Sequence, residues 1–168
     1  MVNRRLFLRT SAFTGFASLL SRYSRGNALP APVKGHPIVI STWDAGINAN
    51  KGAWEVLANG GRALDAVEKG VMVTESEISC CVGLGAYPDR DGIVTLDSSI
   101  MDEHFNCGSV AFLERIKHPV SVARRVMEKT PHVMLAGSGA LQFAIAEGFP
   151  LEEQKLSPSS QKVYDKWL

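Results

Sequence analysis

The sequence predicts one layered domain of α/β or α+β class, preceded by an N-terminal segment of different composition. Its 168 residues, 45% of them hydrophobic, are enough to bury the core of one domain. Short β-branched runs alternate along the chain with segments of helical periodicity, so strands and helices interleave. The sequence contains no internal repeat or low-complexity tract. The predicted sheet needs helices over at least one of its faces.

Residues 1–32 are predicted to be a signal peptide and linker. They carry five arginines and no acidic residue. The stretch from Arg4 to Arg9 resembles a twin-arginine export signal, and the apolar run after it is too short to span a membrane. Small residues place cleavage roughly between Ala28 and Ala31. Such a signal implies a bacterial periplasmic location; an unstructured basic N-terminus is the alternative.

Residues 33–168 form the predicted body, which has 13 basic and 17 acidic residues. The net charge of this body is therefore negative, so it does not indicate a basic surface for binding nucleic acid or anionic lipid. Its cysteines do not suggest a disulfide framework, because a bridge between the neighbours Cys80 and Cys81 is strained and Cys107 lies in an apolar run. A bridge from Cys107 to either neighbour stays open. No pairing at metal-ligand spacing is found among the histidines His36, His104, His118 and His132.

The first half of the body is predicted to hold one strand and two helices. Pro37–Trp43 is β-branched, which is typical of a strand. Residues 52–59 predict a short helix that ends at Gly60 and Gly61, and residues 62–75 predict a longer one. The apolar face of the longer helix consists of Leu64, Val67 and Val71. Beside it, small residues that would let the helix lie close on a sheet are Ala63, Ala66 and Gly70.

The second half begins with three predicted strands, near Val82–Gly85, Ile93–Asp97 and Gly108–Leu113. Residues 121–129 then predict a helix that ends at Thr130, because the residue before a proline avoids the α region. The inward residues of this helix are Val122, Ala123, Val126 and Met127.

Two more helices are predicted after a short strand at residues 132–137. Ser138 is expected to cap the first, which carries Leu141, Ala144 and Ile145 and is closed by Gly148 and Pro150. Ser157 and Pro158 are expected as N-cap and first residue of the last helix, which runs to Leu168.

The glycines Gly83 and Gly85 raise the question of a phosphate-binding loop. Such a loop leads directly into a helix, so that free backbone N–H groups meet the anion. Here Pro88 and a tight turn follow, then a strand, and no Gly-Lys-Ser/Thr is present. The segment is therefore interpreted as a bend where two backbones pass closely.

Three long segments, residues 41–70, 82–103 and 108–137, together resemble the α-chain of the glycosylasparaginase (aspartylglucosaminidase) family. This is a family of N-terminal-nucleophile amidohydrolases that includes isoaspartyl peptidases and plant-type asparaginases. The resemblance runs from Pro37 to Leu168, in order and almost without gaps. Such a continuous match is more specific than a short motif.

The resemblance implies an α+β fold that forms part of a four-layer αββα sandwich. It also implies a precursor that cuts itself before a threonine, which becomes the nucleophile of a β-chain and uses its own α-amino group as the base. The expected substrate amide joins N-acetylglucosamine to asparagine, with plain asparagine and isoaspartyl substrates left open. No metal or cofactor is expected, and the completed enzyme is expected to be a dimer of αβ units.

Two site residues follow from the resemblance. Trp43, in "STWDAG", matches a substrate-site tryptophan of the family; a core or strand-end tryptophan is the alternative. Cys81, in "CVGLGAYPD", replaces a family serine close to the nucleophile, and Ala86 replaces a glycine. A thiol is a weaker donor than a hydroxyl. Asp97 and Asp102 are interpreted as structural.

The chain is expected to lack the nucleophile and to be inactive alone. No threonine follows Asp or Gly, as the self-cleavage site requires; the threonines are Thr10, Thr14, Thr42, Thr74, Thr95 and Thr130. The leading hypothesis is an α-chain-like fragment of an exported glycosylasparaginase that a β-chain completes. The alternatives are a non-catalytic binding or partner subunit on the same scaffold and an unrelated doubly wound binding module.

Overall fold

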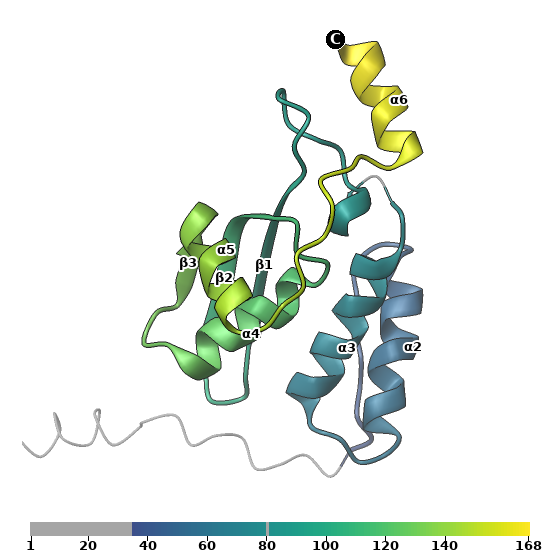
Figure 1. Cartoon of the computed structure of the whole chain (residues 1–168). Helices are drawn as coiled ribbons and strands as arrows, with labels where there is room; N and C mark the ends of the chain where they lie inside the picture. Colours follow the sequence, from purple (N-terminus) through teal and green to yellow (C-terminus); the bar gives the residue numbers. More distant parts are fainter. Residues whose placement is uncertain (1–34, 80) are drawn as a thin grey trace, which may run out of the picture. The chain divides into compact units, whose positions relative to one another are not determined.

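The computed structural model describes residues 35–79 and 81–168, and residues 38–168 form one compact unit. The predicted signal peptide lies outside the described residues. The unit has the expected mixed α+β class, with helices beside a small sheet (Figure 1). Its elements are α2 (Gly46–Leu57), α3 (Ala63–Ser76), η1 (Gly83–Gly85), β1 (Thr95–Met101), β2 (Cys107–Glu114), α4 (Pro119–Lys129), β3 (Met134–Ala136), α5 (Gly137–Ala146) and α6 (Pro158–Trp167).

Helices α2 and α3 form a tightly packed pair (Figure 1). A Cβ atom added to Gly70 of α3 would lie 2.8 Å from the carbonyl oxygen of Ala49 and 3.2 Å from the Cβ of Ala53. Of the predicted small-residue stripe, Ala66 and Gly70 are buried and Gly70 packs on a helix rather than on a sheet, whereas Ala63 is exposed. Because Ala66 and Gly70 face α2, Val67 is turned outward and is 49% exposed, so its predicted core position is wrong.

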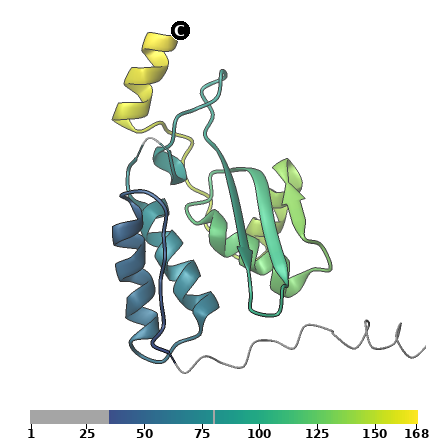
Figure 2. The same ribbon diagram turned by 180° about the vertical axis from the view of Figure 1, so that it is seen from behind.

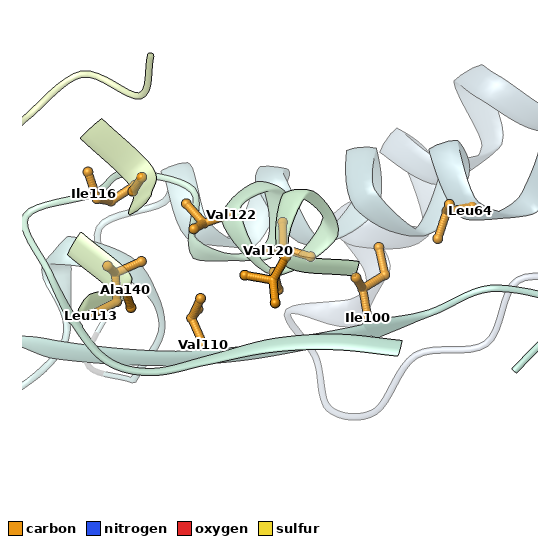
Figure 3. Packing of buried hydrophobic residues seen from close by; sticks show 11 residues of the cluster. Leu64, Ile100, Val110, Leu113, Ile116, Val120, Val122 and Ala140 are labelled. Carbon is orange, nitrogen blue, oxygen red and sulfur yellow. The ribbon is translucent and has the colours of Figure 1, made fainter. Parts of the chain in front are cut away.

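The sheet has the order β1-β2-β3, with β1 and β2 antiparallel and β2 and β3 parallel. Helices α4 and α5 pack on one face and lie behind the strands in Figure 2. Figure 3 shows the core that fills this layer. Its largest fully buried apolar side chains are Val110, Leu113, Ile116, Val120, Val122 and Val126.

The other face of the sheet leaves apolar side chains exposed. Met101, Phe112 and Met134, one from each strand, are all more than half exposed, at 59%, 54% and 55%. Met101 follows the buried Ile100, Phe112 precedes the buried Leu113, and Met134 precedes the partly buried Leu135. We call these three residues the open sheet face; among the described residues, nothing buries them.

The sequence placed two strands wrongly. Pro37–Trp43 is extended from residue 37 to 41 but is not a strand, because it has no partner ladder among the described residues; Ile38 and Ile40 are 81% and 87% exposed. Val82–Gly85 is not a strand either, since Gly83 adopts φ +67° and the chain closes the 3₁₀ turn η1. The strand expected at Ile93–Asp97 begins later, at Thr95, and runs to Met101.

Most helix ends followed local signals, but two did not. Helix α2 begins at Gly46, six residues before the predicted start at residue 52. Thr130 is the C-cap of α4, and the Ser157 side chain accepts the N–H of Ser160 as the N-cap of α6, both as predicted. Ser138 is not a cap, because β3 passes directly into α5 through Gly137 (φ +55°), which places Ser138 inside the first turn. Ile145 of α5 is half exposed.

Candidate functional site

Two chain segments meet at one end of the α2–α3 pair. The Nδ2 of Asn48, in the first turn of α2, donates to the Oε1 of Glu77, just after α3, over 2.9 Å. The turn at Trp43 immediately precedes α2, and the segment through Cys81 follows Glu77. This end of the pair, which Figure 1 shows beside η1, therefore carries both residues that the sequence singled out.

Trp43 is held in an uncommon backbone conformation with its side chain in solvent. Its φ is +64°, in the left-handed region that costs a bulky residue free energy and clusters at functional sites. Its carbonyl oxygen accepts the N–H of Gly46 over 3.0 Å. The side chain is 84% exposed, so the alternative of a core tryptophan is wrong for the described chain. Its contact with a substrate stays a prediction.

Cys81 lies on the surface of the same end. It is disulfide-bonded, so the expectation that these cysteines form no disulfide is wrong at Cys81. Its sulfur therefore offers no S–H donor. Its backbone N–H and that of Val82 point to the Oγ of Ser79, over 3.3 and 3.2 Å. Cys107 is a free cysteine, so the bridge from Cys107 left open by the sequence is not formed. The place of Cys81 near a nucleophile stays a prediction.

The glycine turn η1 is a site of close backbone approach, as expected. A Cβ at Gly83 would collide with the carbonyl oxygen of Glu75, and one at Gly85 would lie 3.0 Å from the nitrogen of Ser79. On its other side, the carbonyl oxygen of Gly85 accepts the hydroxyl of Ser160 from α6 over 2.7 Å. The turn is thus held between the end of α3 and the start of α6.

The two aspartates that sequence analysis set aside are structural. The Oδ1 of Asp97 accepts the N–H of Phe112 over 2.8 Å, where the β1–β2 register shifts and Phe112 has φ +53°. Asp102 accepts the backbone N–H groups of His104 and Asn106 and the Nδ2 of Asn106 in the β1–β2 turn. The hydrogen bond from the Asn106 side chain is the main reason that the pKa of Asp102 is lowered.

Glu75 is a buried carboxyl group that the sequence analysis missed. Its side chain leaves α3 and reaches the start of α4, where Oε1 accepts the N–H of Val120 over 3.0 Å and Oε2 lies 3.2 Å from the Nδ1 of His118. Burial raises the pKa of Glu75 to about 7, with the charge of Glu68 adding to it and the Val120 hydrogen bond opposing it. The sequence does contain a signal for this burial. Glu75 lies eleven residues after Leu64, and that spacing places both residues on the same face of the helix.

The pKa directions decide what kind of contact Glu75 makes. Burial, together with the charge of Lys117, lowers the pKa of His118, while the pKa of Glu75 is raised. Both shifts favour the neutral forms, so the contact is a hydrogen bond more than an ion pair. Its effect is to fasten the N-terminus of α4 to α3.

The described residues also bear on whether the chain holds a metal site or a membrane span. No group of three or more histidine, cysteine, aspartate or glutamate side chains within residues 35–79 and 81–168 could hold a metal ion. Over the same residues, no helix has the length and apolar character to cross a bilayer. A hollow of about 220 Å³ lies between the turn at residues 87–90 and α6, with Tyr87, Tyr164 and Trp167 in its wall.

Comparison with known proteins extends these observations. The profile of a family described as asparaginase matches residues 42–168. An N(4)-(beta-N-acetylglucosaminyl)-L-asparaginase of Elizabethkingia miricola is 50% identical over 170 residues, which cover 99% of this chain and 50% of that protein. The protein of that name from Rattus norvegicus is 43% identical over 79% of this chain and 38% of its own length.

A more distant relative is the plant-type L-asparaginase of Pyrococcus horikoshii. It is 40% identical over 68% of this chain, which covers 36% of that protein. The chain thus spans half or less of the length of these curated relatives, and it matches the N-terminal half of the bacterial one.

Proposed function

Because this chain belongs to the asparaginase family, we propose that it is the α-type portion of an N-terminal-nucleophile amidohydrolase. The proposed reaction is hydrolysis of the amide that joins N-acetylglucosamine to asparagine. The observation that carries this proposal is the 50% identity to the Elizabethkingia miricola glycosylasparaginase over 99% of the chain. The bacterial relative exceeds the plant-type asparaginase both in identity, 50% against 40%, and in the share of this chain that it matches, 99% against 68%. We therefore place the glycosyl-asparagine substrate ahead of plain asparagine.

The proposal includes a second portion, because the chain covers only half of that relative. Two exposed apolar surfaces support it. Ile38 and Ile40 project from an extended segment without a partner strand, and the open sheet face exposes one large side chain on each strand. Unpaired strands and apolar sheet faces are surfaces that proteins normally cover. A second sheet over this face, with strands added beside residues 37–41, would complete the four-layer αββα sandwich.

The proposed division of chemistry follows from what this chain holds. The second portion supplies a threonine at its N-terminus, whose hydroxyl attacks the substrate carbonyl while its α-amino group takes the proton. This chain supplies Trp43 at the end of the α2–α3 pair, where the exposed indole can pack against the substrate and orient it. It needs no metal for this role.

The proposal is tested by rebuilding the whole protein. This chain is joined to the C-terminal half of the Elizabethkingia miricola relative, as a single precursor. We expect self-cleavage into two chains and release of aspartate from N-acetylglucosaminyl-asparagine, more rapidly than ammonia from asparagine. The intact relative is the positive control, and this chain alone is the negative one.

Three other results would change the proposal. A chimera that prefers asparagine or an isoaspartyl peptide would move the chain to another substrate class of the family. A folded, uncleaved and inactive chimera would favour a non-catalytic subunit on the same scaffold. Aspartate release by this chain alone would show that it contains a nucleophile that the sequence does not reveal.

A further inference from the structure

Ser160 is a fully buried polar residue in the first turn of α6, with 0% of its surface exposed. Its hydroxyl donates to the carbonyl oxygen of Gly85 over 2.7 Å and accepts the hydroxyl of Ser157 over 2.9 Å. Its backbone N–H donates to the Oγ of Ser157 over 3.2 Å. The helix therefore begins with a small hydrogen-bonded cluster whose strongest outward contact is to the glycine turn.

Both glycines of the turn lie close to the backbone at and just after the end of α3. A Cβ at Gly85 would lie 3.1 Å from the Cα of Ile78, and one at Gly83 would collide with Glu75. The turn is closed on itself by the N–H of Ala86, which donates to the carbonyl oxygen of Gly83 over 3.0 Å. Ser160 thus pulls the turn against a rigid surface at the end of α3.

We propose that Ser160 is a positioning residue for the substrate site. By holding the carbonyl group of Gly85, it fixes the course of the segment from Cys81 to Ala86, beside the end of the α2–α3 pair where Trp43 lies. Ser160 itself touches no substrate, and it acts through the backbone of the turn. This inference rests on the proposed function, since only then is that end of the pair a substrate site.

The physical reason is the cost of an unmade hydrogen bond. In Ser160→Ala, the buried carbonyl group of Gly85 loses its shorter hydrogen bond and keeps only the 3.5 Å contact from the hydroxyl of Ser157. A buried acceptor with only this weak partner favours conformations in which the turn opens to water. The loss of one such bond changes an equilibrium by about tenfold. The turn should open about tenfold more often, while the core of the sheet is unaffected.

Ser159→Ala is the matched control. Ser159 is the preceding residue of the same helix, is exposed, and contacts the Oγ of Ser157 without reaching Gly85. Both variants are made in the chimera of this chain with the C-terminal half of its bacterial relative. Two quantities are measured: kcat/KM per assembled enzyme, and the amide hydrogen exchange of Ala86 and of β2.

We expect Ser160→Ala to speed exchange of the Ala86 amide about tenfold and to lower kcat/KM by about as much, with exchange in β2 unchanged. Ser159→Ala should match the parent in both. A purely structural role would instead speed exchange in β2 and α6 and reduce the yield of assembled enzyme, with kcat/KM per assembled enzyme retained; that result overturns the proposal.

The experiment separates this proposal from the one on which it rests. An inactive parent chimera refutes the proposed function and with it the role of Ser160 toward a substrate. Faster Ala86 exchange with unchanged kcat/KM in an active chimera refutes the positioning role alone. Unchanged Ala86 exchange shows that Ser160 does not hold the turn.

Discussion

Replacing Glu75 with glutamine should make the folded chain more stable at neutral pH. The glutamine oxygen can still accept the N–H of Val120, and its amide group can donate to the neutral ring of His118, whereas the buried charge is removed. The carboxyl group is 5% exposed and sits between Glu68, whose charge opposes its ionisation, and His118.

The magnitude follows from the pKa. A rise from 4.5 to about 7 costs the ionised folded state roughly 3 kcal/mol, at about 1.4 kcal/mol for each pKa unit. The folded state then holds its proton over a pH range in which the unfolded state has lost it. The free energy of unfolding should therefore fall as the pH rises from 4.5 to about 7, and stay level above that.

The comparison with the variant isolates this one group. The lowered pKa of His118 has the opposite effect on stability, because it makes the free energy of unfolding increase as the pH rises. His118 is present in both proteins, so its contribution largely cancels when their free energies of unfolding are subtracted. We expect Glu75→Gln and the parent to be equally stable near pH 4.5, and the variant to gain up to roughly 3 kcal/mol by pH 7.5.

The assay is urea unfolding of the assembled chimera, in which the open sheet face is covered, followed by circular dichroism at four pH values between 4.5 and 7.5. Glu55→Gln, at an exposed glutamate of α2, is the control and should show no pH-dependent gain. The reasoning would be refuted if the difference in free energy of unfolding between Glu75→Gln and the parent did not change with pH. It would also be refuted by a variant less stable than the parent at pH 7.5, because the carboxylate would then stabilise the fold in its charged form.

Three further predictions follow from the other surfaces and segments. If residues 1–32 are a twin-arginine signal, changing Arg4 and Arg5 to lysine should leave the protein unprocessed in the cytoplasm, and normal periplasmic recovery would contradict this. In the active chimera, Trp43→Ala should lower kcat/KM by about tenfold to a hundredfold with little change in melting temperature, because the side chain is 84% exposed; unfolding with full residual activity would assign it to packing. The chain alone should bind the dye ANS or aggregate and release no aspartate, because its open sheet face is uncovered; a monomer that melts cooperatively without binding ANS would count against a missing partner.

The elements that could be predicted are those with local signals. Helix α4 has a continuous apolar face and a proline after its last residue, and α6 has a serine cap followed by proline; each signal acts between residues close in sequence. Strand β2 was found because its residues alternate between core and surface. These signals act without contacts to residues that are distant in the sequence.

The elements that could not be predicted depend on distant partners. A β-branched run becomes a strand only beside another strand, and Pro37–Trp43 has none among the described residues. The periodicity of α3 was correct, but its closest neighbour was a helix, which turned Val67 outward. At the site, Ser160 and Gly85 are 75 residues apart, so no local pattern announces their hydrogen bond.

The central claim is that the exposed apolar surfaces of this chain are covered by a second portion of the same enzyme. Amide hydrogen exchange of residues 38–41 tests it most directly, measured in the isolated chain and in the assembled chimera. A strand added beside this segment hydrogen-bonds at least alternate N–H groups of residues 38–41 on assembly. We therefore predict fast exchange of all of them in the isolated chain and strong protection of at least alternate ones in the chimera. Equal and fast exchange in both, in a chimera that is assembled and cleaved, would contradict the claim.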